Sequence, residues 1–398
     1  MITREPPGAA QSGFTIVELL ASMAITLAVF GAVFAVLNPA QGTFQVQPEV
    51  SDMQQRLRVA IDALNSDLVM AGAGLYSGPT TRAGGALTSF FAPVMPYRSG
   101  ALHADPPGTF KTDTISLLYI PETAAQTTIR AAISPAASVL EVNGEPGCPA
   151  DPLCGFKQGM QVLVFDGTGA RDLFVVTDAQ GSVGHLQRCG PDSLHSYDPG
   201  SFVVQAIAAT YYLKSDDATQ TYQLARYDGR VTEAPVADNI VGLSFGYLGD
   251  PQPPALRRPV SDSAGPWTTY GPKPPALGVD PGSGYPAGEN CAFAVADGQQ
   301  VPRLADLSPG ATALVPLPAA MLTDGPWCPS PTSAARYDAD LLRIREIRVK
   351  VRVQAGPSLL RGRGALFAKP GYARGGETFV PDQELQFDVV PRNLNLLR

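Results

Sequence analysis

The amino-acid sequence predicts an α+β protein, with a long amino-terminal transmembrane and amphipathic helix packed on a large antiparallel β-sheet head. Three observations support this prediction: an apolar stretch near the amino terminus, a helical pattern that follows it, and alternating apolar and polar residues beyond Tyr76. The chain has 398 residues, of which 44% are hydrophobic, so it can bury a large core. Its 40 glycines and 38 prolines indicate many turns between short strands.

The apolar stretch runs from Phe14 to Leu37, and every residue in it except Glu18 is apolar, small or hydroxylated. A helix of this length rises about 36 Å at about 1.5 Å per residue. That is enough to cross the hydrocarbon core of a bilayer, which is about 30 Å thick. Cleavable secretory signals have a shorter apolar core. The sequence therefore predicts that residues 14–37 span a membrane.

Glu18 is the one acid inside this span. A carboxylate in lipid costs on the order of a few kcal/mol, so it indicates a function and needs a partner. Cleavage between Gly13 and Phe14 would place the new α-amino group of Phe14 about one helical turn from Glu18. In a stack of such helices, Glu18 of one subunit can pair with the amino terminus of its neighbour. The alternative is a simple membrane anchor with an incidental glutamate.

An amphipathic helical pattern extends from about Glu49 to Ala71, after Asn38-Pro39, where proline is expected to kink or interrupt the helix. Its apolar stripe consists of Val50, Met53, Leu57, Ile61, Leu64 and Leu68. The polar residues off this stripe are Asp52, Arg56, Asp62 and Asp67. We expect the apolar face to pack on the head and Gly72 and Gly74 to end the helix.

Alternating patterns beyond Tyr76 predict the strands of the head. These are Thr114–Ile120, Val139–Val142, Met160–Phe165, Leu173–Thr177, Phe202–Ala206, Thr210–Leu213, Tyr222–Tyr227, Ile240–Tyr247, Ile347–Val353 and Leu385–Val390. Residues 215–219 form a polar turn, which predicts a hairpin between Thr210–Leu213 and Tyr222–Tyr227. Leu342 and Ile344 have the opposite parity to the strand that follows them, so we expect a bulge near Glu346.

The stretch from about residue 250 to 332 is rich in Pro-Pro, Gly-Pro and Pro-Gly pairs. We interpret it as a long insertion between two strands of the main sheet. It is either a subunit-specific contact surface or a poorly ordered decoration.

The five cysteines all follow the apolar stretch, in a part of the chain that the topology exports to an oxidising space. Sequence neighbours suggest the disulfides Cys148–Cys154 and Cys291–Cys328, with Cys189 left over. A zinc site of His185, Cys189 and His195 is disfavoured because the spacing is poor and a fourth ligand is lacking. We expect no metal site and no cofactor.

The formal net charge of −7 provides no global attraction to nucleic acid. The one dense basic run consists of Arg343, Arg345, Arg348, Lys350 and Arg352. It is either a patch for DNA or another anionic surface, or the solvated face of a strand with acidic cross-strand neighbours such as Asp388. The acidic balance of the chain favours the strand face, so we expect no nucleic-acid binding.

Catalytic motifs are missing from the sequence: it has no His-Glu-x-x-His, no Gly-x-Ser-x-Gly and no Walker-type loop. The histidines His103, His185 and His195 lack an obvious nucleophile or base beside them. The chain is therefore not expected to be an enzyme. The stretch from Asp166 to Asp172 lacks EF-hand spacing, and a tight turn between two strands is the better interpretation.

Gly13, Phe14 and Glu18, followed by the hydrophobic run, resemble the class III signal of type IV pilins and of type II secretion pseudopilins. The resemblance implies that a prepilin peptidase cleaves after Gly13, that Phe14 is N-methylated, and that Glu18 registers the subunit during assembly. Residues 54–60, followed by residues 67–72, are similar to the helix of PilW-type minor pilins and J-type minor pseudopilins. The tyrosine-rich hairpin, the basic alternating strand and the terminal Pro391-Arg392-Asn393 also resemble PilW-type proteins.

This resemblance implies a leader at residues 1–13, a pilin helix at 14–75 and a β-rich periplasmic or extracellular head at 76–398. We expect a minor pilin that acts in the initiation and assembly of a type IV pilus, within the tip complex. Its partners would be other pilins, the prepilin peptidase and the inner-membrane assembly platform. The subunit would reside in the bacterial inner membrane, head in the periplasm, and then in a pilus or pseudopilus on the cell surface.

Two alternatives stay open. One is a J-type minor pseudopilin of a type II secretion system, and the other is a membrane-anchored adhesin or ligand-binding protein. The chain also departs from the family pattern, because residues 31–35 lack the proline found in many members and no cysteine follows Cys328. These departures indicate that it is not the major fibre subunit.

Overall fold

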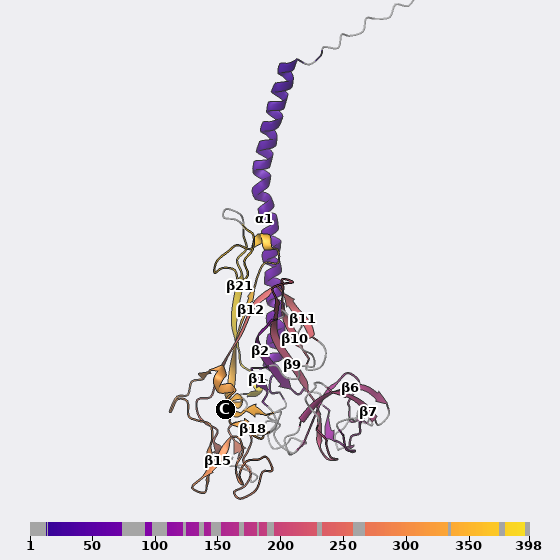
Figure 1. The fold of residues 1–398 in the computed structure, drawn as a ribbon, viewed down its shortest axis with the longest axis vertical. Helices are drawn as coiled ribbons and strands as arrows, with labels where there is room; N and C mark the ends of the chain where they lie inside the picture. The colour runs from indigo at the N-terminus through magenta and orange to yellow at the C-terminus, as the bar shows by residue number, and fades with distance from the viewer. Residues whose placement is uncertain are drawn as a thin grey trace, which may run out of the picture. The chain divides into compact units, whose positions relative to one another are not determined.

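The structure is a computed structural model with one long amino-terminal helix and several antiparallel β-sheets, which confirms the α+β class in its general form (Figure 1). It describes residues 13, 15–73, 92–97, 110–121, 125–134, 139–144, 153–166, 171–180, 183–188, 195–228, 233–257, 267–332, 336–373 and 379–394. The chain divides into an amino-terminal unit, residues 1–53 with 355–381, and a head unit, residues 54–354 with 382–398.

Helix α1 runs continuously from Ile16 to Met70, so Pro39 does not interrupt it. A proline inside a helix removes one backbone hydrogen bond and destabilises the helix by about 3 kcal/mol. The apolar and amphipathic segments on either side both favour the helix, so the loss at one position is not enough to end it. The helix ends as expected at Gly72, which has a φ of +78°. Its backbone N–H donates to the Leu118 carbonyl at 3.2 Å.

In the amino-terminal unit, the segment 355–381 contributes a short 3-10 turn, η4 (Ser358–Leu360). The Gly356 N–H donates to Oε1 of Glu49 on α1 at 2.7 Å. The Tyr372 N–H donates to the Ser358 carbonyl at 2.9 Å, and the Val380 N–H donates to the Leu360 carbonyl at 2.8 Å. These bonds fold the segment on itself and tie it to the helix.

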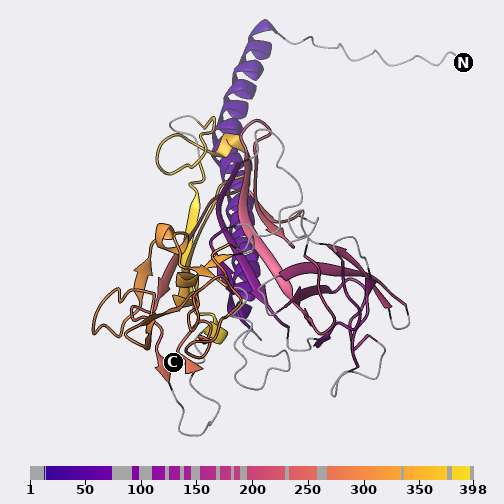
Figure 2. The same ribbon diagram turned by 60° about the horizontal axis from the view of Figure 1, so that its bottom comes forward.

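The first sheet of the head has five strands in the order β1-β2-β9-β10-β11, all antiparallel. They are β1 (Val94–Met95), β2 (Phe110–Tyr119), β9 (Ile207–Asp216), β10 (Thr221–Tyr227) and β11 (Glu233–Asp238). Asp216 pairs with Thr221, which confirms the hairpin predicted around the polar turn. The carboxy-terminal part of α1 lies beside this sheet (Figures 1 and 2).

The second sheet has six strands in the order β3-β8-β5-β6-β7-β4. They are β3 (Gln126–Thr128), β8 (Phe202–Gln205), β5 (Gln161–Phe165), β6 (Arg171–Gln180), β7 (Val183–Arg188) and β4 (Val139–Leu140). Its core includes Ile129, Val162, Val164, Phe174 and Tyr197, each of which is fully buried. Phe165 pairs with Arg171, so a hairpin joins β5 to β6 where the sequence predicted a turn.

The third sheet has four strands in the order β17-β12-β20-β21. They are β17 (Val315–Leu317), β12 (Ile240–Gly249), β20 (Ile344–Val353) and β21 (Gln383–Val389). The expected bulge is confirmed, because Leu248 pairs with Glu346 while Gly249 pairs with Ile344. Arg345 is therefore the extra residue, and it lets Ile344 and Ile347 both face the core despite their opposite parity.

The predicted insertion lies between β12 and β20, which pair directly with each other. It has secondary structure of its own, in the form of short strands and turns. After the insertion, β19 (Tyr337–Asp338) and η3 (Ala339–Arg343) lead into β20; within it lie β17, β13 (Leu256–Arg257), β14 (Trp267–Thr268), β15 (Phe293–Ala296), β16 (Gln299–Pro302), η2 (Ala319–Leu322) and β18 (Trp327–Cys328). The disulfide between Cys291 and Cys328, the pairing suggested by the sequence, closes the loop that carries most of them.

Candidate membrane and assembly site

The amino-terminal part of α1, Ile16–Phe34, is long and apolar enough to cross a membrane, with a mean hydropathy of 2.2 over 19 residues. Each of its large apolar side chains is between 45% and 78% exposed. Burying one such side chain stabilises a protein by about 1.5–3 kcal/mol, so leaving all of them in water would be costly. A helix satisfies its own backbone groups, so it can reside in lipid. This helix therefore fits a membrane anchor.

The polar side chains within this helix are bonded to its own backbone. Ser22 Oγ donates to the Leu19 carbonyl at 2.8 Å, and Thr26 Oγ1 donates to the Ser22 carbonyl at 2.7 Å. Neither hydroxyl therefore opposes insertion into lipid. Glu18 is the single ionisable residue between Ile16 and Phe34.

Thr15 and Glu18 form a reciprocal cap at the start of α1. The Thr15 N–H donates to Glu18 Oε2 at 3.0 Å, and the Glu18 N–H donates to Thr15 Oγ1 at 3.3 Å. Thr15 Oγ1 also donates to Glu18 Oε2 at 2.9 Å. This is the capping-box arrangement of Thr-x-x-Glu. The Thr-x-x-Glu spacing is visible in the sequence, whereas the expectation for Glu18 rested on its charge alone.

Gly13 lies just before the cap and is exposed. A Cβ added at Gly13 would meet nothing within 4 Å, so the fold itself gives no reason for a glycine there. Phe14 lies outside the described residues. The predicted cleavage position thus sits beside an exposed residue at the end of an exposed helix.

The basic run does not form a free cationic patch. On β20, Arg348 pairs with Asp388 at 2.8 Å, which confirms the acidic cross-strand neighbour expected from the sequence. Lys350 pairs with Glu384 at 3.0 Å and Arg352 with Asp382 at 2.9 Å. These ion pairs balance the positive charges on the solvent-facing side of β20.

Arg343 and Arg345, by contrast, are buried, which the interpretation of the run as a solvated strand face missed. Arg343 has a fully buried side chain and donates from Nε to Asp340 Oδ1 at 2.5 Å. Its Nη1 donates to the carbonyls of Asp250 and Pro251, each at 3.2 Å, and Nη2 donates to the Ala305 carbonyl at 2.6 Å. Arg343 therefore joins the start of β20 to two separate parts of the insertion.

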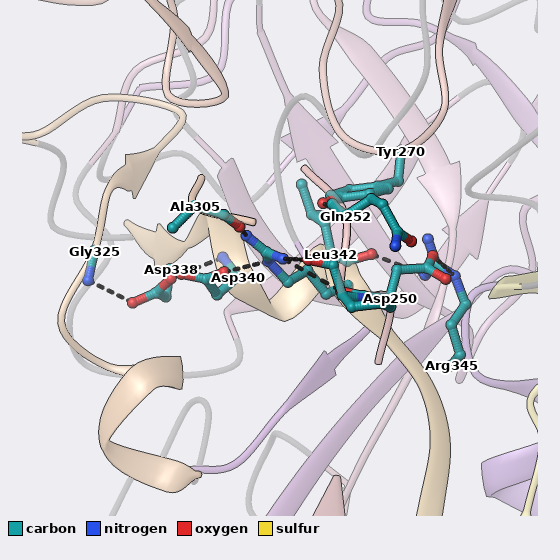
Figure 3. Close-up of polar contacts among 11 residues, drawn as sticks. Asp250, Gln252, Tyr270, Ala305, Gly325, Asp338, Asp340, Leu342 and Arg345 are labelled. Carbon is teal, nitrogen blue, oxygen red and sulfur yellow. Dashed lines mark hydrogen bonds and ion pairs between the residues drawn. The ribbon is translucent and has the colours of Figure 1, made fainter. Parts of the chain in front are cut away.

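The groups around Arg343 complete the Arg343 cluster, defined here as Arg343 with Asp250, Asp338, Asp340 and Arg345 (Figure 3). Asp338 accepts the backbone N–H groups of Asp340 and Gly325, at 2.8 and 2.5 Å. Arg345 pairs with Asp250 Oδ2 at 2.7 Å. Burial raises the pKa of Asp340 to about 6, although the Arg343 charge opposes the rise.

The cysteines and histidines form no metal centre in the described part of the chain, where no three potential ligands cluster. His195 lies 3.5 Å from Asp172, from Nδ1 to Oδ1. Cys154 is disulfide-bonded. Its suggested partner Cys148, the remaining Cys189 and His103 lie outside the described residues.

No protein-family model matches the sequence, and a search of curated proteins finds no match.

Proposed function

We propose that this chain is a minor pilin of the PilW type, which a prepilin peptidase processes and which takes part in initiating and assembling a type IV pilus. The observation that carries the proposal is a capped amino-terminal helix with exposed apolar side chains from Ile16 to Phe34 and Glu18 as its single ionisable residue. Such a helix can be held in the inner membrane by lipid and later by other helices in a fibre core. The head would lie with other minor pilins in the tip complex.

In this proposal Glu18 keeps its cap and gains a second partner. Both Thr15 donors reach Oε2, which leaves Oε1 for a further donor. Cleavage after Gly13 frees the α-amino group of Phe14, and that ammonium on a neighbouring subunit can donate to Oε1. The pair neutralises a carboxylate that is costly in lipid, so it favours one register between adjacent helices.

Substitutions at Glu18 separate the charge from the cap. Glu18→Gln retains an acceptor for the cap but loses the charge, whereas Glu18→Ala loses both. We expect both variants to reach the membrane folded and to be lost from sheared fibres. Ser22→Ala is the control, since Ser22 bonds only to its own helix, and it should be recovered normally. Normal recovery of the Glu18→Gln protein in sheared fibres would contradict a role for the charge. Only the helix-capping role of Glu18 would then remain.

Mass spectrometry of the mature amino terminus tests the processing step directly. We expect the chain to begin at N-methylated Phe14. A chain that still begins at Met1 in its native host contradicts assembly and favours a membrane-anchored adhesin or ligand-binding protein.

A J-type minor pseudopilin of a type II secretion system uses the same processing and the same helix physics. Deletion of the gene separates the two roles, because a pilus role predicts the loss of surface fibres and a secretion role predicts the loss of exported enzymes.

A further inference from the structure

A pocket of about 410 Å³ opens on the head unit between its first and third sheets. This volume falls within the range of small-ligand sites, about 300–1,000 Å³. Its walls are largely aromatic or apolar, with one carboxylate among them: Pro96, Tyr97, Asp113, Thr114, Phe245 and Tyr247. Ser116 Oγ donates to the Tyr97 carbonyl at 2.5 Å, which holds the Pro96-Tyr97 wall against β2.

Asp113 is placed in this pocket by a β-bulge. Between the pairs Thr112–Leu213 and Ile115–Tyr211, β2 has two residues where β9 has one. Asp113 is one of the two and has a φ of +30°, a conformation that non-glycine residues rarely adopt. Bulges of this kind commonly redirect a side chain at a binding site.

Among the described residues, the carboxylate of Asp113 has a hydrogen-bond donor but no paired cation. Asp113 is exposed over much of its surface, but partial desolvation at the pocket wall raises the pKa of its carboxyl, and the hydrogen bond from the Phe245 backbone N–H opposes the rise. Within the described part of the chain, no lysine, arginine or histidine forms an ion pair with Asp113. By comparison, the carboxylates opposite β20 are paired with cations.

Tyr247 is the most buried of the named wall residues, at 6% exposure. Its hydroxyl is buried and has no hydrogen-bond partner among the described residues. Burial, and then the nearby charge of Asp113, raises the pKa of this hydroxyl. Buried hydroxyls are usually satisfied, and an orphaned one needs an explanation.

We infer that this pocket binds a cationic side chain of a partner protein, lysine or arginine, between the Asp113 carboxylate, the Tyr247 hydroxyl and the aromatic walls. The carboxylate supplies the countercharge, and the tyrosine oxygen, which is buried in the empty pocket, accepts a second N–H once the pocket wall shifts to admit the cation. Tyr97, Phe245 and Tyr247 also line the pocket, and aromatic π-systems attract positive charge. An anionic ligand would be repelled by Asp113, and a single carboxylate is too few ligands for a divalent metal ion.

This inference does not depend on the pilin role, because the pocket lies in the head. It is tested on the full-length chain in neutral detergent by saturation-transfer NMR. The probes are N-acetyl-lysine N-methylamide and N-acetyl-norleucine N-methylamide, which differ mainly in the terminal ammonium. We expect the lysine probe to bind at least about tenfold more tightly, as one charge-assisted contact predicts. Equal binding of the two probes would overturn the inference.

Variants of the pocket provide the second test. Asp113→Asn keeps an acceptor for the Phe245 N–H but removes the charge, so it should fold normally and bind the lysine probe about tenfold more weakly. Asp297→Asn is the matched control, because Asp297 is an exposed acid outside the pocket that also has a positive φ, +51°. An Asp113→Asn protein that binds like the wild type, or an equal loss in Asp297→Asn, would overturn the inference.

Tyr247→Phe tests the hydroxyl separately. Because the hydroxyl has no hydrogen-bond partner among the described residues, its removal should leave the melting temperature unchanged or raised. Binding of the lysine probe should weaken several-fold. Unchanged binding would overturn the role assigned to Tyr247.

Discussion

The Tyr211 hydroxyl on β9 donates a 2.7 Å hydrogen bond to Oδ2 of Asp67, a buried carboxylate on α1. Two more donors reach the same carboxylate: the Tyr119 hydroxyl at 3.0 Å and the Arg226 Nε at 2.8 Å. Asp67 therefore joins the helix to strands β2, β9 and β10 through one charged, hydrogen-bonded group. The amphipathic pattern placed Asp67 off the apolar stripe, but the residue is buried because the three strands supply hydrogen-bond donors for its carboxylate.

Replacement of Asp67 by alanine should strongly destabilise the head. The change leaves the Arg226 charge without its acid and removes the acceptor of two tyrosine hydroxyls. Loss of one partner of a buried pair typically costs about 3–5 kcal/mol. Chemical denaturation of the full-length protein in detergent measures the free energy of unfolding. Asp62→Ala, an exposed acid on the same helix, is the control and should change it by less than about 0.5 kcal/mol. Similar losses in the two variants would show that Asp67 has no special role.

Alkaline pH should destabilise the same network. Burial and the Asp67 charge raise the pKa of Tyr119 to about 12, and they raise that of Tyr211 further. A raised folded-state pKa means that the neutral phenol is favoured by folding. This stability is fully present below the unfolded pKa of about 10 and is lost as the pH rises through about 12. Melting temperature measured from pH 8 to 12 should therefore fall, and the fall should be shallower in Tyr119→Phe. An unchanged slope in that variant would contradict the prediction.

Arg343→Met should destabilise the head, because it removes the hydrogen bonds that join Arg343 to the insertion. The variant keeps an apolar stem of similar length but leaves Asp340 buried without its cation and the carbonyls of Asp250, Pro251 and Ala305 without a donor. The expected loss is about 3–5 kcal/mol, together with faster proteolysis between residues 250 and 332. Arg348→Met breaks a solvent-exposed pair on the same strand, and its effect on the free energy of unfolding should be much smaller. Equal effects of the two variants would exclude a special role for Arg343.

The sequence was informative wherever a local pattern determines the structure. The parity change between Ile344 and Ile347 predicted the bulge at Arg345, because a register step must appear in the alternation. Opposite charges on neighbouring strands likewise predicted the pairing of Arg348 with Asp388.

Buried polar residues could not be predicted in this way. Asp67 is buried because Tyr211 and Arg226, more than a hundred residues further along the chain, satisfy it, and no local pattern near Asp67 reveals them. Arg343 belongs to a basic run, but its acceptors come from the insertion. The position of the Asp113 carboxylate depends on a bulge in β2. The strand predicted from the sequence began at Thr114 and therefore did not include this bulge.

Removal of the Cys291–Cys328 disulfide should loosen the insertion without unfolding the span. The two cysteines are separated by 37 residues. In the chain-entropy model, closing a loop of that length lowers the entropy of the unfolded chain, which stabilises the folded state by about 4 kcal/mol. A Cys291→Ala, Cys328→Ala double variant removes this bond alone, whereas a reductant would also attack the disulfide of Cys154. Limited proteolysis should then cut within residues 267–332 well before the wild type is cut, while membrane retention is unchanged. Identical cleavage rates would mean that the Arg343 cluster and the short strands hold the insertion by themselves.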